Sequence, residues 1–433
     1  MIEYVKKLFR KYIGDSAYKK NVLTMIIGRV LGQVIPILLT PLLTRIYSPE
    51  EFGVFAVYIT IVTILAMISN GRYCLAVILP KKEQDAKHLV MISFLVSLIS
   101  ILLFIILISL MGPMFFRLIN SEVLQKYIWI IILNILFIAL HETLFYYALR
   151  LKKYRILASD IIFYTSVVVI VRLWLGYSGY TGIGLFTSYM VGYTLSFVYL
   201  FLRLSILKGF RMSDITFNYY KSLFLKYSRF PKYSLLADTL NMTSLMSPNL
   251  FLNKLFGSAT AGYFSMSNKV LGSPIWLVTT SVGDVFKQEV SEQLRKRGNC
   301  FEVFIKTART LFLLGFIPFL LLFIVAPYLF PIILGANWEP VGYYVRIFSL
   351  MYFAKFVVNP VSQIVYILDK QNYGVLFQSL KIISIIIAFS FGYWFNNINL
   401  GLILWSGLTT VSYIIIFLMS QKLTKDAKTI LEK

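Results

Sequence analysis

The sequence predicts an all-α membrane protein whose twelve transmembrane helices form two six-helix lobes. Three observations predict this fold class. Apolar runs of about 20 residues recur along the whole chain, the connectors between them are alternately rich and poor in Lys and Arg, and the sequence contains a short internal repeat. Hydrophobic residues make up 58% of the 433 residues and charged residues only 14%, whereas soluble domains carry about 25% charged residues. The composition therefore excludes a soluble globular protein.

Twelve segments are long and apolar enough to cross a hydrocarbon core of about 30 Å, which requires roughly 20 helical residues. In chain order they are residues 21–43, 53–79, 89–111, 126–148, 157–175, 182–202, 231–256, 260–286, 308–330, 342–368, 374–395 and 400–420.

The basic residues orient these spans. Of the 42 Lys and Arg residues, 31 lie in the N-terminal segment, every second connector and the C-terminal tail, whereas the opposite connectors hold three and the spans hold eight. Because basic residues in short loops are biased toward the cytosol, both termini are predicted to be cytoplasmic. The net charge of +23 then reflects topology and attraction to anionic lipid rather than nucleic-acid binding.

An internal repeat predicts the domain organisation. Residues 43–47 match residues 252–256, and residues 52–55 match residues 261–264, both at an offset of 209. Parallel repeats of this kind are related by an axis along the membrane normal and bind substrate at their interface. The predicted domains are a cytoplasmic segment 1–20, an N-lobe 21–202 with spans one to six, a cytoplasmic linker 203–230, a C-lobe 231–421 with spans seven to twelve, and a cytoplasmic tail 422–433.

Charged residues within the spans indicate a site, because each costs about 2.5–3.5 kcal/mol at a helix centre unless it faces an interior or a watery cavity. Arg29, Lys269 and Lys355 lie eight or more residues from either end of their spans, roughly 12 Å deep at 1.5 Å per residue. They are predicted to face a central chamber, with Arg72 near its cytosolic mouth.

Amide side chains recur at helical spacing on spans one, seven, eight and ten and predict the polar lining of that chamber. They are Gln33, Asn241, Asn249, Asn268, Asn359 and Gln363. Hydrogen bonding between helices is the alternative for each of them. A chamber with more Lys and Arg than Asp and Glu selects anions, and phosphate oxygens are the natural partners of these side chains.

Three acidic residues, Asp238, Asp284 and Glu142, are candidates for a gate or for proton coupling, and the sequence selects none of them. Asp238 also occupies the position equivalent to Arg29 in the second repeat, which suggests an inter-lobe ion pair that breaks on substrate entry. His141-Glu142 lacks the second His, four residues on, that a zinc-binding helix needs. No metal site, cofactor or catalytic residue is predicted.

Several segments resemble a known family: residues 41–53, 72–80, 256–265 and 359–362. They are similar to bacterial polysaccharide flippases of the Wzx type, in the polysaccharide transporter branch of the multidrug/oligosaccharidyl-lipid/polysaccharide (MOP) superfamily. The resemblance implies a MATE-like fold in the bacterial inner membrane. Relatives often carry Glu after the Arg-Tyr pair, where this chain has Cys74, so the ion-pair partner of Arg72 stays open.

The function implied by this resemblance is translocation of undecaprenyl-diphosphate-linked oligosaccharide repeat units from the cytoplasmic to the outer leaflet, by alternating access around a cationic chamber. Such units feed O-antigen, capsule or exopolysaccharide synthesis, and a polymerase and a chain-length regulator of the same pathway are implied partners. A cation or drug antiporter of the same superfamily and a non-transporting scaffold of a polysaccharide assembly complex are the alternatives. The sequence does not identify the glycan.

Overall fold

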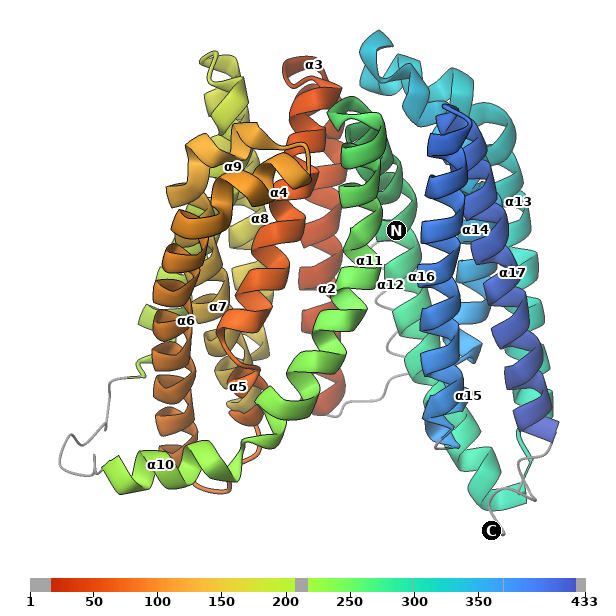
Figure 1. The fold of residues 1–433 in the computed structure, drawn as a ribbon. Helices are drawn as coiled ribbons and strands as arrows, with labels where there is room; N and C mark the ends of the chain where they lie inside the picture. Colours follow the sequence, from red (N-terminus) through yellow and green to blue (C-terminus); the bar gives the residue numbers. More distant parts are fainter. Residues whose placement is uncertain (1–16, 207–216, 298, 369, 426–433) are drawn as a thin grey trace. The chain divides into compact units, whose positions relative to one another are not determined.

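The computed structural model describes residues 17–206, 217–297, 299–368 and 370–425, and within these ranges its regular elements are all helices (Figure 1). Residues 1–16 of the predicted N-terminal segment, residues 207–216 of the linker and residues 426–433 of the tail lie outside the described residues. The all-α prediction is therefore confirmed for the part of the chain that is described.

The N-terminal elements are α2 (Ala17–Leu38), α3 (Thr40–Ile46), α4 (Pro49–Ser69), α5 (Tyr73–Ala76), α6 (Glu83–Leu118), η1 (Glu122–Tyr127), α7 (Ile128–Arg150), α8 (Tyr154–Tyr177) and α9 (Thr181–Leu204). They are followed by α10 (Phe217–Lys226), η3 (Phe230–Ser234), α11 (Leu235–Phe256), α12 (Ser258–Arg297), α13 (Phe301–Leu334), η4 (Ala336–Trp338), α14 (Glu339–Val361), α15 (Ile364–Ile367), α16 (Gln371–Trp394) and α17 (Ile398–Lys425).

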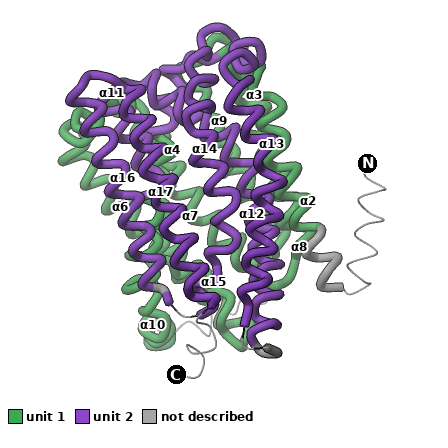
Figure 2. The backbone as a smooth tube through the Cα atoms, turned by 90° about the vertical axis from the view of Figure 1, so that its right-hand side faces the viewer, with its two compact units in different colours: residues 1–46, 58–243 green, residues 47–57, 244–433 purple. Residues whose placement is uncertain are grey.

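The chain divides into two compact units, coloured separately in Figure 2: residues 1–46 with 58–243 (unit 1), and residues 47–57 with 244–433 (unit 2). In unit 1, α9 packs against α7 and α8, and α2 packs against α8. In unit 2, α14 packs against α12, α13 and α17, and α16 packs against α17. The lobe boundaries predicted from the sequence remain a prediction.

Each of the twelve predicted spans is largely helical, and the first, second and tenth are each divided between two α-helices. Among the described residues, ten helical segments are long and apolar enough to cross a membrane, and α11 and α12 are not among them. Yet α11 has 22 residues and α12 has 40, so length does not disqualify either helix. Polar side chains lower the hydropathy of both helices, and the polar chamber wall expected on spans seven and eight stays a prediction.

The second span is not the continuous helix that was predicted over residues 53–79. Helix α4 ends at Ser69, and the chain turns at Gly71 and Arg72 before the four-residue helix α5. Both turn residues adopt left-handed backbone, with φ of 54° and 58°. The break was not predicted, because the segment is apolar throughout and hydropathy does not report backbone conformation.

A further helix, α10, lies within the predicted inter-lobe linker, where none was predicted. Figure 1 shows α10 crosswise to α6 at one end of unit 1. Its Leu223 is buried in a core cluster with Leu89 of α6, Leu157 of α8 and Leu204 of α9. The Tyr219 hydroxyl also donates to Asp85 Oδ1 at 2.6 Å. These contacts fix α10 to the end of the unit 1 bundle.

Candidate functional site

Arg72 lies in a strained turn. Its φ of 58° and ψ of 14° place it in the left-handed region, which is rare for residues other than glycine and costs of order 1–3 kcal/mol. The Arg72 backbone N–H donates to Asn70 Oδ1 at 2.8 Å, which stabilises the turn. Residues in such rare backbone conformations concentrate at functional sites, so the conformation of Arg72 makes it a candidate functional residue.

The Arg72 side chain is held by two carboxylates from distant parts of the sequence. Its Nη1 lies 3.0 Å from Glu142 Oε1 on α7, and its Nη2 lies 2.5 Å from Asp238 Oδ2 on α11. Nε also donates to Asp238 Oδ2 at 2.7 Å, and Asn70 Nδ2 donates to Glu142 Oε2 at 2.8 Å. The guanidinium side chain is only 13% exposed, so these charge-assisted contacts are largely shielded from water.

This cluster borders a cavity of about 400 Å³ within unit 1. Its polar lining includes Arg72, Glu142, Asp238, Asn241 and His141. The structure therefore brings together four of the residues predicted for the chamber, its mouth and its gate. One guanidinium faces two carboxylates, so the excess of Lys and Arg predicted for the chamber is not seen in this cavity.

His141 of the cavity lining forms a largely buried pair with a carboxylate. His141 Nε2 is 2.9 Å from Asp160 Oδ2 on α8, and Ser196 on α9 donates to the other oxygen of Asp160. Asp160 is 1% exposed. Both carboxylate oxygens thus have partners, as a buried charge requires, and the pair ties α7 to α8 and α9.

Aromatic rings pack beside this pair. Tyr193 contacts His141 edge to face with ring centroids 5.5 Å apart, and it also packs on Tyr164 at 4.6 Å and on Tyr189 at 5.1 Å. Tyr193 itself lines the cavity. The cavity wall therefore combines fixed charge with aromatic faces.

A second polar cluster lies in unit 2. The Tyr352 hydroxyl on α14 donates to Asn268 Oδ1 on α12, and the Lys355 ammonium lies 5.1 Å from the centroid of the Tyr352 ring. Lys381 on α16 lies 4.9 Å from the Phe377 ring centroid, and its charge interacts repulsively with that of Lys355. Among the described residues, no carboxylate forms an ion pair with either lysine.

The other predicted chamber residues are placed as follows. Arg29 is exposed on α2, one turn before the half-buried Gln33, and Lys269 is half-buried on α12. Asn249 is buried on α11, whereas Asn359 of α14 and Gln363, which follows α14, are half-buried.

The candidate gate residue Asp284 lies exposed on α12, where it forms an i,i+3 pair with Lys287 at 3.6 Å. Asp238, the predicted partner of Arg29, pairs with Arg72. Among the described residues, no group of three or more His, Cys, Asp or Glu side chains is placed to hold a metal ion.

Sequence reasoning missed Asp160 and treated His141 only as a failed zinc ligand. A signal was present, because Asp160 is a carboxylate inside an apolar span, and such residues are functional candidates by default. The pairing with His141 was hidden, because the two residues lie on different helices.

Comparison with known proteins places the chain in a family. The family model described as "Polysaccharide biosynthesis protein" matches residues 42–342, which is more than half of the chain. No curated protein matches the chain in sequence.

Solved structures share its fold. The lipid II flippase MurJ in an inward closed conformation superposes with a TM-score of 0.73 at 13% identity, over 95% of this chain and 89% of that chain. A point mutant of the Vibrio cholerae MATE transporter VcmN gives 0.60 at 11% identity, over 94% and 96%. An inward-facing multidrug resistance MATE family transporter of the MOP superfamily gives 0.59 at 13% identity, over 98% and 99%.

At these identities the structural likeness establishes the fold alone, and it confirms the predicted MATE-like architecture. The match to the family model shows that the chain is a member of a polysaccharide biosynthesis family, as the sequence resemblance implied. The chain therefore belongs to the polysaccharide biosynthesis protein family and shares its fold with the flippase MurJ and the MATE transporters.

Proposed function

We propose that this protein is a flippase that moves undecaprenyl-diphosphate-linked oligosaccharide repeat units from the cytoplasmic to the outer leaflet of the bacterial inner membrane. The repeat units supply O-antigen, capsule or exopolysaccharide synthesis, and a polymerase and a chain-length regulator of that pathway act on the product. Both termini lie in the cytoplasm. Family membership supports the substrate class, and the helical fold of the MOP transporters supports transport.

The observation that carries the proposal is the shielded guanidinium of Arg72, held at a cavity by Glu142 and Asp238. A planar guanidinium binds carboxylates and phosphates through the same forked geometry. A diphosphate presents oxygens of the kind that the two carboxylates now supply. A diphosphate would therefore compete with these carboxylates for the Arg72 guanidinium.

In the proposed mechanism, the diphosphate exchanges with the carboxylates. Asp238 lies on α11 and Glu142 on α7, so the cluster links both helices to the turn after α4. Displacing the carboxylates removes this link and permits the rearrangement that alternating access requires. Protonation of Glu142 or Asp238 frees Arg72 in the same way, which offers a route for proton coupling.

Unit 2 contributes its own cations. Lys355 and Lys381 repel one another, and an anion that binds near them relieves this repulsion. Arg29 and Lys269 are assigned to the same diphosphate-binding role from their depth in the predicted spans. Asn241, Asn268 and the tyrosine faces near Tyr193 are assigned to the glycan, since amides and aromatic rings suit sugar hydroxyls and ring faces.

The experiment compares Arg72→Ala with a matched control, Arg117→Ala, in cells that lack the native protein. Arg117 is 82% exposed and forms a long, exposed pair with Glu122. Arg72→Ala is expected to accumulate polyprenyl-diphosphate-linked glycan on the cytosolic leaflet and to abolish surface polysaccharide, whereas Arg117→Ala does neither. Normal surface polysaccharide from a membrane-inserted Arg72→Ala protein contradicts the proposal.

A cation or drug antiporter is the second candidate. The excess of carboxylates in the unit 1 cavity favours it, because Glu142 and Asp238 outnumber Arg72 there. An antiporter exports a cationic dye in exchange for protons, and Glu142→Gln abolishes that export. A flippase leaves dye accumulation unchanged when the protein is removed.

A further inference from the structure

We propose that a cleft between α12 and α13, in unit 2, binds the headgroup of a phosphatidylethanolamine molecule. The cleft has a volume of about 720 Å³, within the roughly 300–1,000 Å³ range of small-molecule sites. All of its lining residues lie between Val282 and Leu314, so the site belongs to this helix pair alone. The proposal does not depend on the flippase function.

The position of the cleft suits a lipid headgroup. Helix α13 has 34 residues and α12 has 40, or about 51 Å and 60 Å at 1.5 Å per residue, whereas a hydrocarbon core is about 30 Å thick. Both helices therefore exceed the hydrocarbon thickness, and the charged side chains near the turn between them, Glu289, Glu302 and Lys306, favour that end for the excess. The basic connector there is predicted to be cytoplasmic.

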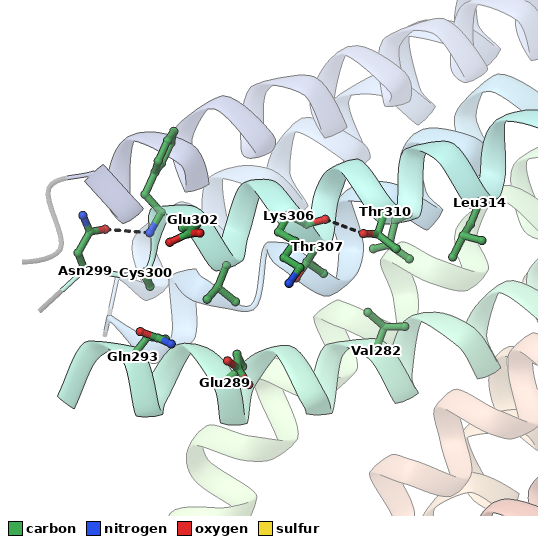
Figure 3. Close-up of a pocket in the computed structure, with 13 residues that line it drawn as sticks. Val282, Glu289, Gln293, Asn299, Cys300, Glu302, Lys306, Thr307, Thr310 and Leu314 are labelled. Atoms are coloured by element: carbon green, nitrogen blue, oxygen red, sulfur yellow. Dashed lines mark hydrogen bonds between the residues drawn. The ribbon is translucent and has the colours of Figure 1, made fainter. Parts of the chain in front are cut away.

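The cleft changes in polarity along its length. Figure 3 shows Gln293, Asn299 and Glu302 toward the turn, Lys306 and the threonines in the middle, and Val282 and Leu314 at the other end. A phospholipid changes in the same order, from charged headgroup through glycerol esters to acyl chain.

The apolar end continues onto the outer surface of α13. Leu314 is 64% exposed, and exposed apolar side chains follow it at intervals of three and four residues. They are Ile317, Leu321, Ile324 and Tyr328. This spacing forms one stripe along a helix, which gives an acyl chain a continuous path from the cleft.

The charges of the cleft select the headgroup. Glu289 and Glu302 supply two carboxylates, and Lys306 supplies one ammonium. A headgroup with one primary ammonium and one phosphate complements this set, because the ammonium donates to the carboxylates and the phosphate accepts from Lys306. Phosphatidylglycerol offers no ammonium, and the choline group of phosphatidylcholine has no N–H to donate.

Native mass spectrometry of the purified full chain tests this, with short-chain phosphatidylethanolamine, phosphatidylglycerol and phosphatidylcholine added at equal concentrations. We expect phosphatidylethanolamine to be preferred by about tenfold, the factor expected for one charge-assisted hydrogen bond. The double variant Glu289→Gln with Glu302→Gln is expected to lose this preference. Lys306→Gln is expected to weaken the binding of all three lipids, because each carries a phosphate.

Matched controls lie one turn away. Glu292→Gln on α12 and Arg309→Gln on α13 change charges outside the cleft lining and are expected to leave the lipid preference unchanged. Thr310→Trp fills the cleft from an exposed position and is expected to exclude every lipid. Equal binding of the three lipids, a preference for phosphatidylglycerol, or a preference that survives the double Gln variant overturns the proposal.

Discussion

Gly53 and Gly262 each lie against the backbone of the helix that carries the other. A Cβ atom on Gly53 would lie 1.7 Å from the carbonyl oxygen of Ser258, and a Cβ atom on Gly262 would lie 1.9 Å from that of Pro49. Ser258 follows Pro49 by 209 residues, as Gly262 follows Gly53. Contacts that exchange partners in this way are those of two related segments meeting across a local twofold axis. The contact joins the two copies of the sequence repeat.

Either Gly53→Ala or Gly262→Ala should therefore disrupt the start of α4 against α12. The methyl group would overlap backbone atoms, which cannot rotate away, so the cost should exceed the roughly 1–3 kcal/mol typical of overpacking. Thermal unfolding and the monodisperse fraction of purified protein measure this. Gly407 of α17 is the control, because a Cβ there meets nothing within 4 Å. Gly407→Ala should be neutral or stabilising by up to about 1 kcal/mol, and an equal effect at all three glycines would refute the steric explanation.

Stability and transport should separate at the Arg72 cluster. Arg72→Ala alone leaves Glu142 and Asp238 without their cation. Because these carboxylates are 27% and 36% exposed, the cost should be below the roughly 3–5 kcal/mol of breaking a fully buried pair. The triple variant Arg72→Ala, Glu142→Gln, Asp238→Asn removes the unpaired charges and should recover most of that stability. Thermal melts of the two variants in the same detergent give the comparison; a triple variant as unstable as the single one would show that charge pairing is not the cause.

Arg346 should contribute more to stability while Pro327 is present than when Pro327 is replaced. Proline has no N–H, so Pro327 leaves the carbonyl of Phe323 without its usual helical donor, and Arg346 Nε donates to that oxygen at 2.9 Å. Arg346 Nη2 also donates to Ile324 O at 3.3 Å. Arg346→Met should destabilise the protein by about 1–3 kcal/mol.

The same change should cost less in a Pro327→Ala background, where the alanine N–H satisfies the Phe323 carbonyl. A double-mutant cycle on melting temperature measures the coupling between the two positions. Identical costs in both backgrounds would mean that Arg346 acts by some route other than the freed carbonyl.

Both cysteines should resist alkylation in the folded protein. Cys74 is 0% exposed and Cys300 is 2% exposed. Burial raises the pKa of Cys300 to about 11, so its reactive thiolate is scarce at neutral pH and increases as pH rises toward that value. A maleimide reagent near neutral pH should label neither residue quickly, whereas the denatured chain should take up label at both cysteines. Rapid labelling of the native protein would contradict the burial of these thiols.

The fold was largely predictable because it depends on averages over long segments. The twelve apolar runs correspond largely to helices, even where α11 and α12 carry polar side chains. The break at Gly71 and Arg72 was not predictable in this way, because hydropathy depends on composition and does not report a left-handed turn inside an apolar run. Helix α10 was missed because its stability comes from Leu223 and Tyr219 packing on other helices, which a local pattern does not reveal.

The candidate site was predictable in its members and not in its pairing. Arg72, Glu142, Asp238 and Asn241 were each singled out as charged or polar residues in an apolar chain. Their partners were not, because Arg72 meets Glu142 across 70 residues and Asp238 across 166. The expected pairing of Asp238 with Arg29 followed the repeat offset and stays a prediction, whereas the contact of Asp238 with Arg72 depends on the backbone turn at Arg72.

The role of Arg72 in moving a diphosphate is tested most directly by translocation in proteoliposomes. The substrate is a fluorescent polyprenyl-diphosphate-linked oligosaccharide, and its transfer between leaflets is followed by quenching from one side. Wild-type protein should transfer it, and the folded triple variant Arg72→Ala, Glu142→Gln, Asp238→Asn should not. Transfer by that variant at the wild-type rate would show that Arg72 does not bind the moving headgroup.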